Sequence, residues 1–322
     1  MKRMRRWDRP LKFVTAIITV VAVTSSFGVT SLNAEENPPR DGSATRPLQV
    51  LLIPADTGAD TTLDDFKPVF SAIQENYGLH FELRVGTSYG AVVEGLVAKR
   101  ADIAFVGPVG FHQARLRHAA ELLAVAVKDN SSSYYAAILT RKDSGVELLN
   151  DLRGKRIALG DINSTSSFRF PVAMLQRIGI DPVVGLGQVV ITGSHSNALA
   201  ALREAQVDAA GCSLAAYEKA INSGAISRGE LKVLAISPAI PNPPLVMHPD
   251  LSDSVKERLR EAFREIHRAP GVRPEMIRGY GGDRYERFDV SFPQEDFDRA
   301  IEQLAPVTQK LIASIIEQAA NR

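Results

Sequence analysis

Ser164, Thr165, Ser166 and Ser167 place four hydroxyl groups in succession near the middle of the chain. An apolar, strand-like run ends before them at residue 159, and a helical stretch is expected over residues 169–179. Hydroxyls at a helix start can cap free backbone N–H groups, and those N–H groups with the helix dipole can also bind a small anion. Because four hydroxyls exceed what one cap needs, we expect an oxyanion here. On the pattern alone, an N-cap with surplus hydroxyls is equally compatible.

Tyr89 and His195 occupy matching places in a faint internal repeat. Residues 88–105 align without gaps on residues 194–211, and in each copy a serine opens a helix. Tyr89 and His195 directly follow these serines, so each falls at a helix start. Two similar lobes could thus present one donor each. Taken singly, a histidine here is more simply a capping or packing residue, and a tyrosine a half-buried rim residue.

Strands and helices alternate along the chain around these residues. Residues 48–53 form an apolar run closed by Pro54, residues 64–77 have helical spacing, and residues 81–85 alternate as a strand. We therefore expect an α/β fold with largely parallel pairing. The length of 322 residues and the hydrophobic content of 45% suffice for two cores of this kind.

The N-terminus has the three parts of a secretory signal peptide. A basic segment, residues 1–12, precedes an apolar run, residues 13–23, and small or polar residues lead to Ala34. We expect cleavage after Ala34. The alternative is an uncleaved anchor, but residues 24–26 interrupt the run of about 20 apolar residues that a membrane span needs.

Cleavage at this point changes the charge of the protein. Residues 1–34 hold six of the 38 basic residues and one of the 37 acidic residues, so the remainder has a formal net charge of −4. This balance gives no basic footprint for nucleic acid, which we exclude as a partner. The single Cys212 excludes an intrachain disulfide and is interpreted as a small buried apolar residue.

Several segments together resemble the PhnD-like periplasmic proteins that bind phosphonate, phosphate or phosphite for ABC transporters. The likeness rests on Gly-Asp-x-Asn-Ser-Thr-Ser followed by an aromatic residue at 160–168, Gly-Ser-His at 193–195 and Val-Asp-Ala at 207–209. It extends from about residue 48 to about residue 300. Further similar segments are residues 88–89, 101–105 and 279–282.

The resemblance implies a type II periplasmic-binding fold, with two α/β lobes flanking a ligand cleft and two chain crossings between them. We expect the crossings at residues 140–144 and near residues 235–238. An amphipathic helix at 252–267 and a last helix at about 294–319, kinked at Pro306, should pack on lobe 1. The expected divisions are a signal peptide at 1–34, a flexible lead-in at 35–47, lobe 1 at 48–141, lobe 2 at 142–236, and the return segment of lobe 1 with the C-terminal helices at 237–322.

The resemblance also implies which residues contact the anion. Hydroxyls and backbone N–H groups can surround tetrahedral oxygens without a formal charge, which suits an anion that must bind and then leave. Asp161 and Asn163 are expected to shape the loop through Asx-type hydrogen bonds, and Arg169, on the helix, need not face it. We expect no catalytic residue, metal or cofactor. The primary candidates are Ser164, Thr165, Ser166, His195 and Tyr89, and the secondary ones are Ser167, Asp56 and Thr57.

The charge pattern around the site bears on specificity. Family members that take aminoalkylphosphonates are expected to hold the ammonium group with carboxylates, but residues 211–216 and 237–244 carry no acid and Glu218 lies too far along. An amine buried without a counter-charge is costly. We therefore expect phosphate, phosphite or a small alkylphosphonate, without ranking them, over 2-aminoethylphosphonate.

The resemblance implies a periplasmic protein that delivers its anion to an ABC permease and its ATPase. Its membrane contact would run only through the permease or an uncleaved N-terminal segment. The same fold could serve a sensory module that reports the anion to a membrane signalling partner. An enzyme is the least favoured class, because the sequence has no His-Glu-x-x-His motif and no paired cysteines for a metal site, and a run of hydroxyls at a helix start suits anion binding better than attack on a carbonyl.

Overall fold

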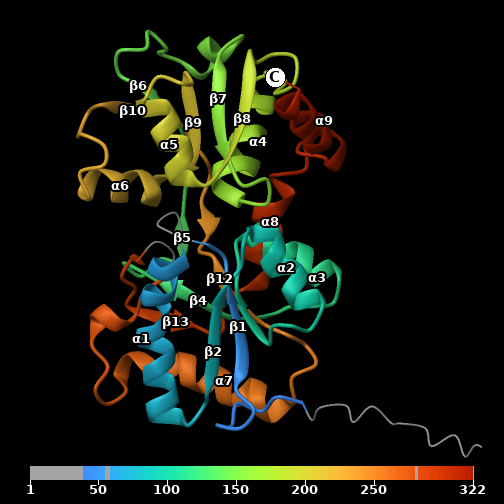
Figure 1. The fold of residues 1–322 in the computed structure, drawn as a ribbon, viewed down its shortest axis with the longest axis vertical. Coiled ribbons are helices and arrows are strands. Elements are labelled where there is room, and N and C mark those ends of the chain that lie inside the picture. Colours follow the sequence, from blue (N-terminus) through green and yellow to red (C-terminus); the bar gives the residue numbers. More distant parts are fainter. Residues whose placement is uncertain (1–38, 55–58, 280–281, 322) are drawn as a thin grey trace, which may run out of the picture. The chain divides into compact units, whose positions relative to one another are not determined.

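The computed structural model describes residues 39–54, 59–279 and 282–321. The expected signal peptide and two secondary site candidates, Asp56 and Thr57, lie outside these residues. Two β-sheets flanked by helices confirm the α/β class (Figure 1). We call the six-stranded sheet with its helices lobe 1 and the five-stranded sheet with its helices lobe 2. No helix among the described residues has both the length and the apolarity to cross a membrane.

Lobe 1 has the strand order β13-β4-β12-β3-β1-β2. β1 pairs in parallel with β2 and β3, whereas the strands that return to this sheet, β12 and β13, pair antiparallel with their neighbours. The sheet is therefore mixed, and only its first three strands match the expected parallel pairing. The strands are β1 (Leu48–Leu52), β2 (Phe81–Val85), β3 (Ile103–Phe105), β4 (Glu121–Val127), β12 (Pro244–Met247) and β13 (Arg287–Asp289).

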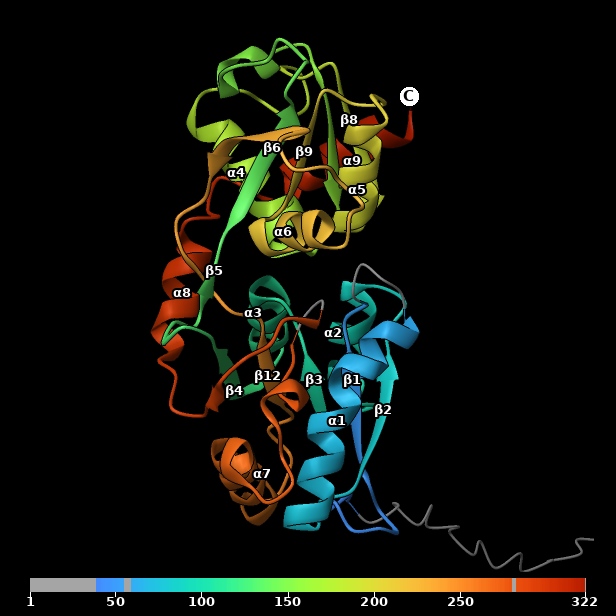
Figure 2. The same ribbon diagram turned by 90° about the vertical axis from the view of Figure 1, so that its left-hand side faces the viewer.

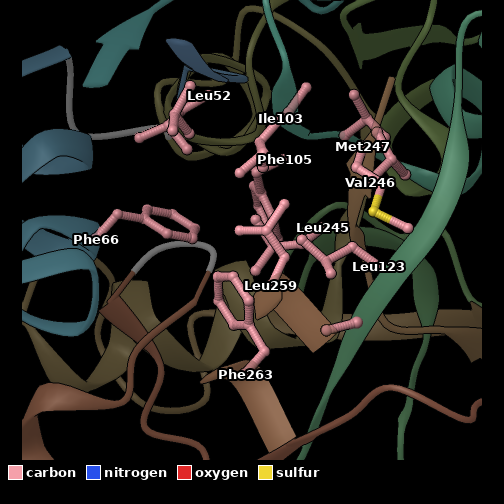
Figure 3. Close-up of a cluster of buried hydrophobic side chains, with 14 of the residues drawn as sticks. Leu52, Phe66, Ile103, Phe105, Leu123, Leu245, Val246, Met247, Leu259 and Phe263 are labelled. Atoms are coloured by element: carbon pink, nitrogen blue, oxygen red, sulfur yellow. The ribbon is translucent and has the colours of Figure 1, made fainter. Parts of the chain in front are cut away.

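Aromatic and aliphatic side chains join the lobe 1 sheet to helices α1 (Ala59–Tyr77) and α7 (Asp253–Glu265). Figure 3 shows Phe66 of α1 and Phe263 of α7 among the side chains of the central strands. The Phe66 ring lies 4.8 Å from the ring of Phe105, and both are buried. Both helices were expected from the sequence, although α1 begins at Ala59 and not at residue 64. Two shorter helices, α2 (Tyr89–Val97) and α3 (Pro108–Leu116), also pack on this sheet.

Lobe 2 has the strand order β10-β6-β9-β7-β8. β7 pairs in parallel with β8 and β9, and β6 and β10 are antiparallel additions at one edge. This arrangement repeats the parallel triplet of lobe 1, which agrees with the two similar lobes that the internal repeat predicted. The elements are β6 (Ala136–Arg141), β7 (Arg156–Gly160), β8 (Gln188–Gly193), β9 (Ala209–Ser213), β10 (Leu231–Ile236), α4 (Phe170–Arg177), α5 (His195–Arg203) and α6 (Leu214–Asn222).

The chain crosses between the lobes along two short strands that pair with each other, β5 (Ser133–Tyr134) and β11 (Ile240–Pro241). Figure 2 shows β5 between β4 of lobe 1 and β6 of lobe 2. The first crossing therefore precedes β6, and the prediction at residues 140–144 is wrong, because Ala136 already pairs with Ser213 inside the lobe 2 sheet. Both segments are polar, so polarity alone could not distinguish the crossing from the turn after β6. The second crossing lies between β10 and β12, next to the expected position.

The C-terminal segment forms two helices where a single kinked one was predicted. α8 (Gln294–Glu302) packs against α3 in lobe 1. α9 (Gln309–Ala320) lies beside β8 in lobe 2 (Figures 1 and 2), where Ile312 and Ile315 are buried. The expected packing on lobe 1 is thus wrong for α9. Pro306 lies in the break between the helices, where it cannot continue the helical hydrogen bonds.

The described part of the expected flexible lead-in is joined to lobe 1 by backbone hydrogen bonds. The N–H of Gly42 donates to the carbonyl of Arg46 at 3.1 Å, and the N–H of His80 donates to the carbonyl of Gly42 at 2.9 Å. These bonds tie the segment before β1 to the segment before β2. Residues 39–47 are therefore part of the folded lobe, which corrects the expectation of a flexible segment.

Candidate functional site

A cavity of about 500 Å³ lies between the lobes and is lined by both of them and by both crossings. Lobe 1 contributes Tyr89, and lobe 2 contributes Ser164, Thr165, Ser166 and His195. The fold thus gathers all five primary candidates, which come from three separate segments of the chain, around one cavity. Their contact with a ligand stays a prediction.

Ser164, Thr165 and Ser166 stand where β7 runs into helix α4. Ser164 is the N-cap, and its Oγ accepts a hydrogen bond of 3.2 Å from the N–H of Ser167. The first turn is π-helical, closed by a hydrogen bond of 3.1 Å from the Arg169 N–H to the Ser164 carbonyl, and it runs on into α4. Single π-turns of this kind are frequent at functional sites. One hydroxyl therefore caps this helix, and the hydroxyls of Thr165 and Ser166 are not needed to cap it.

The phenol of Tyr134 is a part of this site that the sequence analysis missed. It shares hydrogen bonds with the side chains of Ser166 and Thr165, and its burial raises the pKa of Tyr134 to about 12. Tyr134 belongs to the crossing strand β5, so the site joins a hinge segment to lobe 2. The run Ser-Ser-Ser-Tyr-Tyr at residues 131–135 was a signal, but the crossing was expected further along, at residues 140–144.

His195 begins helix α5 and is 2% exposed. Its Nδ1 accepts a hydrogen bond of 3.0 Å from the backbone N–H of Ser213 at the end of β9. A backbone amide can only donate, so Nδ1 is the acceptor nitrogen and Nε2 carries the ring proton. The neutral imidazole therefore has one N–H with which to donate.

Tyr89 holds the corresponding position in lobe 1. Ser88 caps α2 by accepting a hydrogen bond of 3.1 Å from the Ala91 N–H, and Ser194 caps α5 with the same geometry. The repeat predicted both caps, and the structure confirms them. Because the cap fixes where each helix begins, Tyr89 and His195 are each held as the first helical residue, one from each lobe, at the same cavity.

Ser167, a secondary candidate, is absent from the described lining of the cavity. Its side chain is fully buried against Gly160, the last residue of β7. A Cβ atom placed on Gly160 would lie 2.2 Å from the Ser167 Oγ. The glycine of the motif therefore lets Ser167 pack against the strand.

Asp161 and Asn163 shape the loop before the hydroxyl cluster of residues 164–166, as predicted. The Asp161 Oδ1 accepts a hydrogen bond of 2.7 Å from the Asn163 N–H, which closes an Asx-type turn. Burial raises the pKa of Asp161, although two backbone N–H donors and Arg169 oppose the shift. The Arg169 Nε donates to the carbonyl of Ile162 at 2.7 Å, so this guanidinium supports the loop and is not among the described residues lining the cavity.

Three acidic side chains, Asp129, Glu218 and Asp283, also line the cavity. Burial raises the pKa of Asp283, although Lys128 and Lys219 act in the opposite direction. Lys128 is the single lysine or arginine among the described lining residues. The cavity therefore combines neutral donors with a region of mixed charge.

These acids correct the argument that carboxylates are missing. α6 begins at Leu214, directly after β9, and both Leu214 and Glu218 line the cavity. The two residues are four positions apart and so lie on one helix face. Glu218 is therefore close enough to line the cavity, which corrects the expectation. Asp129 and Asp283 come from segments outside residues 211–216 and 237–244.

Comparisons with known proteins agree with this geometry. The family model for the periplasmic phosphonate substrate-binding protein of ABC transporters matches residues 51–291. The phosphonates-binding periplasmic protein of Escherichia coli is 27% identical over 259 residues, which cover 79% of this chain and 75% of that protein. The phosphate-import protein PhnD of Mycolicibacterium smegmatis is 25% identical over 227 residues, which cover 67% of this chain and 70% of that protein.

Solved structures share the fold. A binding-protein component of an ABC phosphonate transporter from Pseudomonas aeruginosa aligns with a TM-score of 0.68 at 20% identity, covering 85% of this chain and 98% of that one. PhnD1 from Prochlorococcus marinus, solved in complex with methylphosphonate, aligns with a TM-score of 0.67 at 18% identity, covering 81% and 97%. Both likenesses agree with the type II two-lobe architecture expected from the sequence.

Proposed function

Because this chain belongs to the family of periplasmic substrate-binding proteins of phosphonate ABC transporters, we propose that it captures a phosphorus oxyanion between its lobes and delivers it to an ABC permease and its ATPase. The proposed ligands are phosphate, phosphite or a small alkylphosphonate. The proposed location is the periplasm, reached after removal of the signal peptide.

The convergence of neutral donors from three parts of the fold carries this proposal. Lobe 2 supplies the hydroxyls of the Ser164–Ser166 cluster and the Nε2–H of His195, β5 supplies the phenol of Tyr134, and lobe 1 supplies the phenol of Tyr89. All of them can donate to tetrahedral oxygens. None adds a fixed positive charge, so the anion can be released again when the cleft opens.

Binding by both lobes gives the proposed mechanism. An anion that accepts from Tyr89 on one side and from Ser166 and His195 on the other stabilises the closed arrangement, because only that arrangement satisfies all donors at once. The permease would then receive the loaded, closed protein. Opening separates the donors and releases the ligand.

The size of the cavity supports an anion that carries a substituent. At the ~30 Å³ that one water occupies, a tetrahedral oxyanion of five heavy atoms fills on the order of 150 Å³. The cavity of about 500 Å³ leaves room for more. Because Glu218 and Asp283 also line it, an aminated substituent belongs among the ligands to be tested.

The hydrogen bonds of His195 support binding without catalysis. With Nδ1 occupied by the Ser213 N–H and the proton on Nε2, this imidazole cannot accept a proton from a neighbouring hydroxyl. His195 therefore cannot act as the general base that a nucleophilic serine of the Ser164–Ser166 cluster would need.

Titration calorimetry on residues 35–322 tests the proposal, with phosphate, phosphite, methylphosphonate, 2-aminoethylphosphonate and sulfate as ligands. We expect tight binding of at least one phosphorus anion and no binding of sulfate. A preference for 2-aminoethylphosphonate would keep the transport role and overturn the ligand range. No binding of any phosphorus anion would contradict the proposed function.

A further inference from the structure

The loop at residues 161–165 also makes direct hydrogen bonds from lobe 2 to lobe 1. The Gln113 Nε2 of α3 donates a hydrogen bond of 3.1 Å to the Asn163 Oδ1. The Val109 N–H, also of α3, donates to the Thr165 Oγ1 at 3.0 Å. The Tyr89 N–H of α2 donates to the Asp161 Oδ2 at 3.4 Å. Three polar side chains at alternate positions of this loop, Asp161, Asn163 and Thr165, thus bond to two helices of the other lobe.

Asn163 is held in place within its own lobe before it meets Gln113. Its backbone N–H donates to Asp161, and its Oδ1 also receives the Arg169 Nη2 at 3.4 Å. The guanidinium of Arg169 is itself anchored on the Ile162 carbonyl. The amide oxygen of Asn163 is therefore already oriented toward lobe 1 by bonds within lobe 2. Closing of the lobes does not have to immobilise this side chain.

Helix α3 depends on lobe 2 for part of its N-terminal capping. Its N-cap is Gly107, which has no side chain to accept a hydrogen bond, and Pro108 follows as the first helical residue. The Val109 N–H, which an α-helix leaves without an internal partner, is bonded to Thr165. Separation of the lobes would give up this bond and the one between Gln113 and Asn163.

Neither Gln113 nor Asn163 is among the described residues that line the cavity. We propose that Gln113 and Asn163 are positioning residues that hold the lobes closed independently of the ligand and so set the affinity for every ligand alike. The ligand part of this proposal rests on the proposed function. If closing precedes or accompanies binding, the apparent dissociation constant rises as the closed fraction falls, whatever the ligand.

Gln113→Ala tests the proposal, with Gln74→Ala as the matched control, because Gln74 is exposed on α1 of the same lobe. Spin labels on cysteines at Val184 in lobe 2 and Glu257 in lobe 1 report the separation of the lobes by electron paramagnetic resonance. We expect Gln113→Ala to move the ligand-free distribution toward longer distances. Affinities for inorganic phosphate and methylphosphonate should both fall about fivefold, the loss of one ordinary hydrogen bond, with their ratio unchanged. Gln74→Ala should change neither.

An unchanged distance distribution in Gln113→Ala would overturn the proposal, as would a change in the ratio of the two affinities. In a double-mutant cycle, Gln113→Ala should cost little in a protein that already carries Asn163→Ala, and additive losses would contradict a direct pair. Failure of the unmodified protein to bind any phosphorus anion would remove the proposed function. The distances in the ligand-free protein would still decide the positioning role.

Discussion

The backbone N–H of Ser213 and the Nδ1 of His195 are joined by a hydrogen bond of 3.0 Å that links the end of β9 to the start of α5. This bond fixes the tautomer of the imidazole, so that the Nε2–H is the group that can donate. Because His195 lines the cavity, the position of one proposed ligand donor is set by a strand end and a helix start, both parts of the regular fold. Tyr89 is likewise held at the start of a helix, because Ser88 caps α2 as Ser194 caps α5.

His195→Ala removes this donor from the proposed site. We expect the free energy of phosphate binding to weaken by about 1–3 kcal/mol, the cost of leaving a buried partner unsatisfied. His195→Gln, whose amide nitrogen can take over the donor role, should lose less. Titration calorimetry measures both, and unchanged affinity in His195→Ala would remove the residue from the site.

Thr165→Ala and Ser164→Ala remove hydroxyls with different partners. Thr165 receives the Val109 N–H from lobe 1, and Ser164 caps the helix of lobe 2. Each change should weaken anion binding by about 1–3 kcal/mol per lost buried partner. Ser164→Ala should also lower the free energy of unfolding by about 1 kcal/mol through loss of the cap. Thr165→Ser keeps the hydroxyl and is the control. If the variant that carries both Ser164→Ala and Thr165→Ala bound the anion as tightly as the unmodified protein, the proposed binding site would be contradicted.

Tyr134→Phe should weaken phosphate binding and change the stability at high pH. The pKa of this phenol is raised to about 12 by burial, from an unfolded value of 10.0. Above pH 10 the unfolded chain gives up the proton that the folded protein retains, so the free energy of unfolding falls as the pH rises toward 12. Tyr134→Phe lacks this contribution, so its free energy of unfolding should fall less over this range, although burial also raises the pKa of Tyr77, Tyr217 and Tyr285. Urea denaturation at pH 9 and pH 11 measures it, with exposed Tyr135→Phe expected to follow the unmodified protein.

Gly160→Ala should destabilise lobe 2 by about 1–3 kcal/mol, since an added Cβ overpacks a close contact. The new atom would lie 2.2 Å from the Ser167 Oγ and 2.8 Å from the Ser167 Cβ. Adding Ser167→Ala removes the shorter of these contacts and should recover part of the loss. Ser167→Ala alone should leave phosphate affinity unchanged, as thermal unfolding and calorimetry on the three variants will show. A Gly160→Ala protein that unfolds at the same temperature as the unmodified protein would contradict the packing argument.

Asp283→Asn should raise the melting temperature of the ligand-free protein at pH 7. Burial raises the pKa of this carboxyl, so its charged form costs stability in the folded state. A raised pKa stabilises the fold below the unfolded pKa of about 3.9, and this contribution is lost as the pH rises through the folded pKa. The gain from the substitution should therefore shrink as the pH falls toward 4. Melting curves at pH 4 and pH 7 check the sign, and equal melting temperatures at pH 7 would contradict it.

The sequence predicted the features that depend on local pattern. The serine caps of α2 and α5, and the Asx turn between Asp161 and Asn163, follow from residue types a few positions apart, and the structure confirms them. The two-lobe fold and the gathering of Tyr89 and His195 at one cavity followed from the family resemblance.

The features that the sequence analysis missed depend on contacts between distant segments. Nothing near Thr165 indicates that its hydroxyl receives the Val109 N–H, 56 residues away. The bond between Tyr134 and the hydroxyl cluster requires the correct position of the crossing, and two polar stretches competed for that position. Glu218 was expected to lie too far along the chain to reach the site, but it lies one turn of α6 after Leu214, and both residues line the cavity. α9 leaves the lobe to which α8 belongs because the helical segment breaks near Pro306.

A crystal structure of the protein grown with methylphosphonate would test the central claim most directly. The account predicts the phosphorus group in the cavity, with its oxygens within hydrogen-bond distance of the hydroxyls of Ser164–Ser166, of the His195 Nε2 and of the Tyr89 phenol from the other lobe. An anion bound elsewhere, or held by one lobe alone, would contradict it.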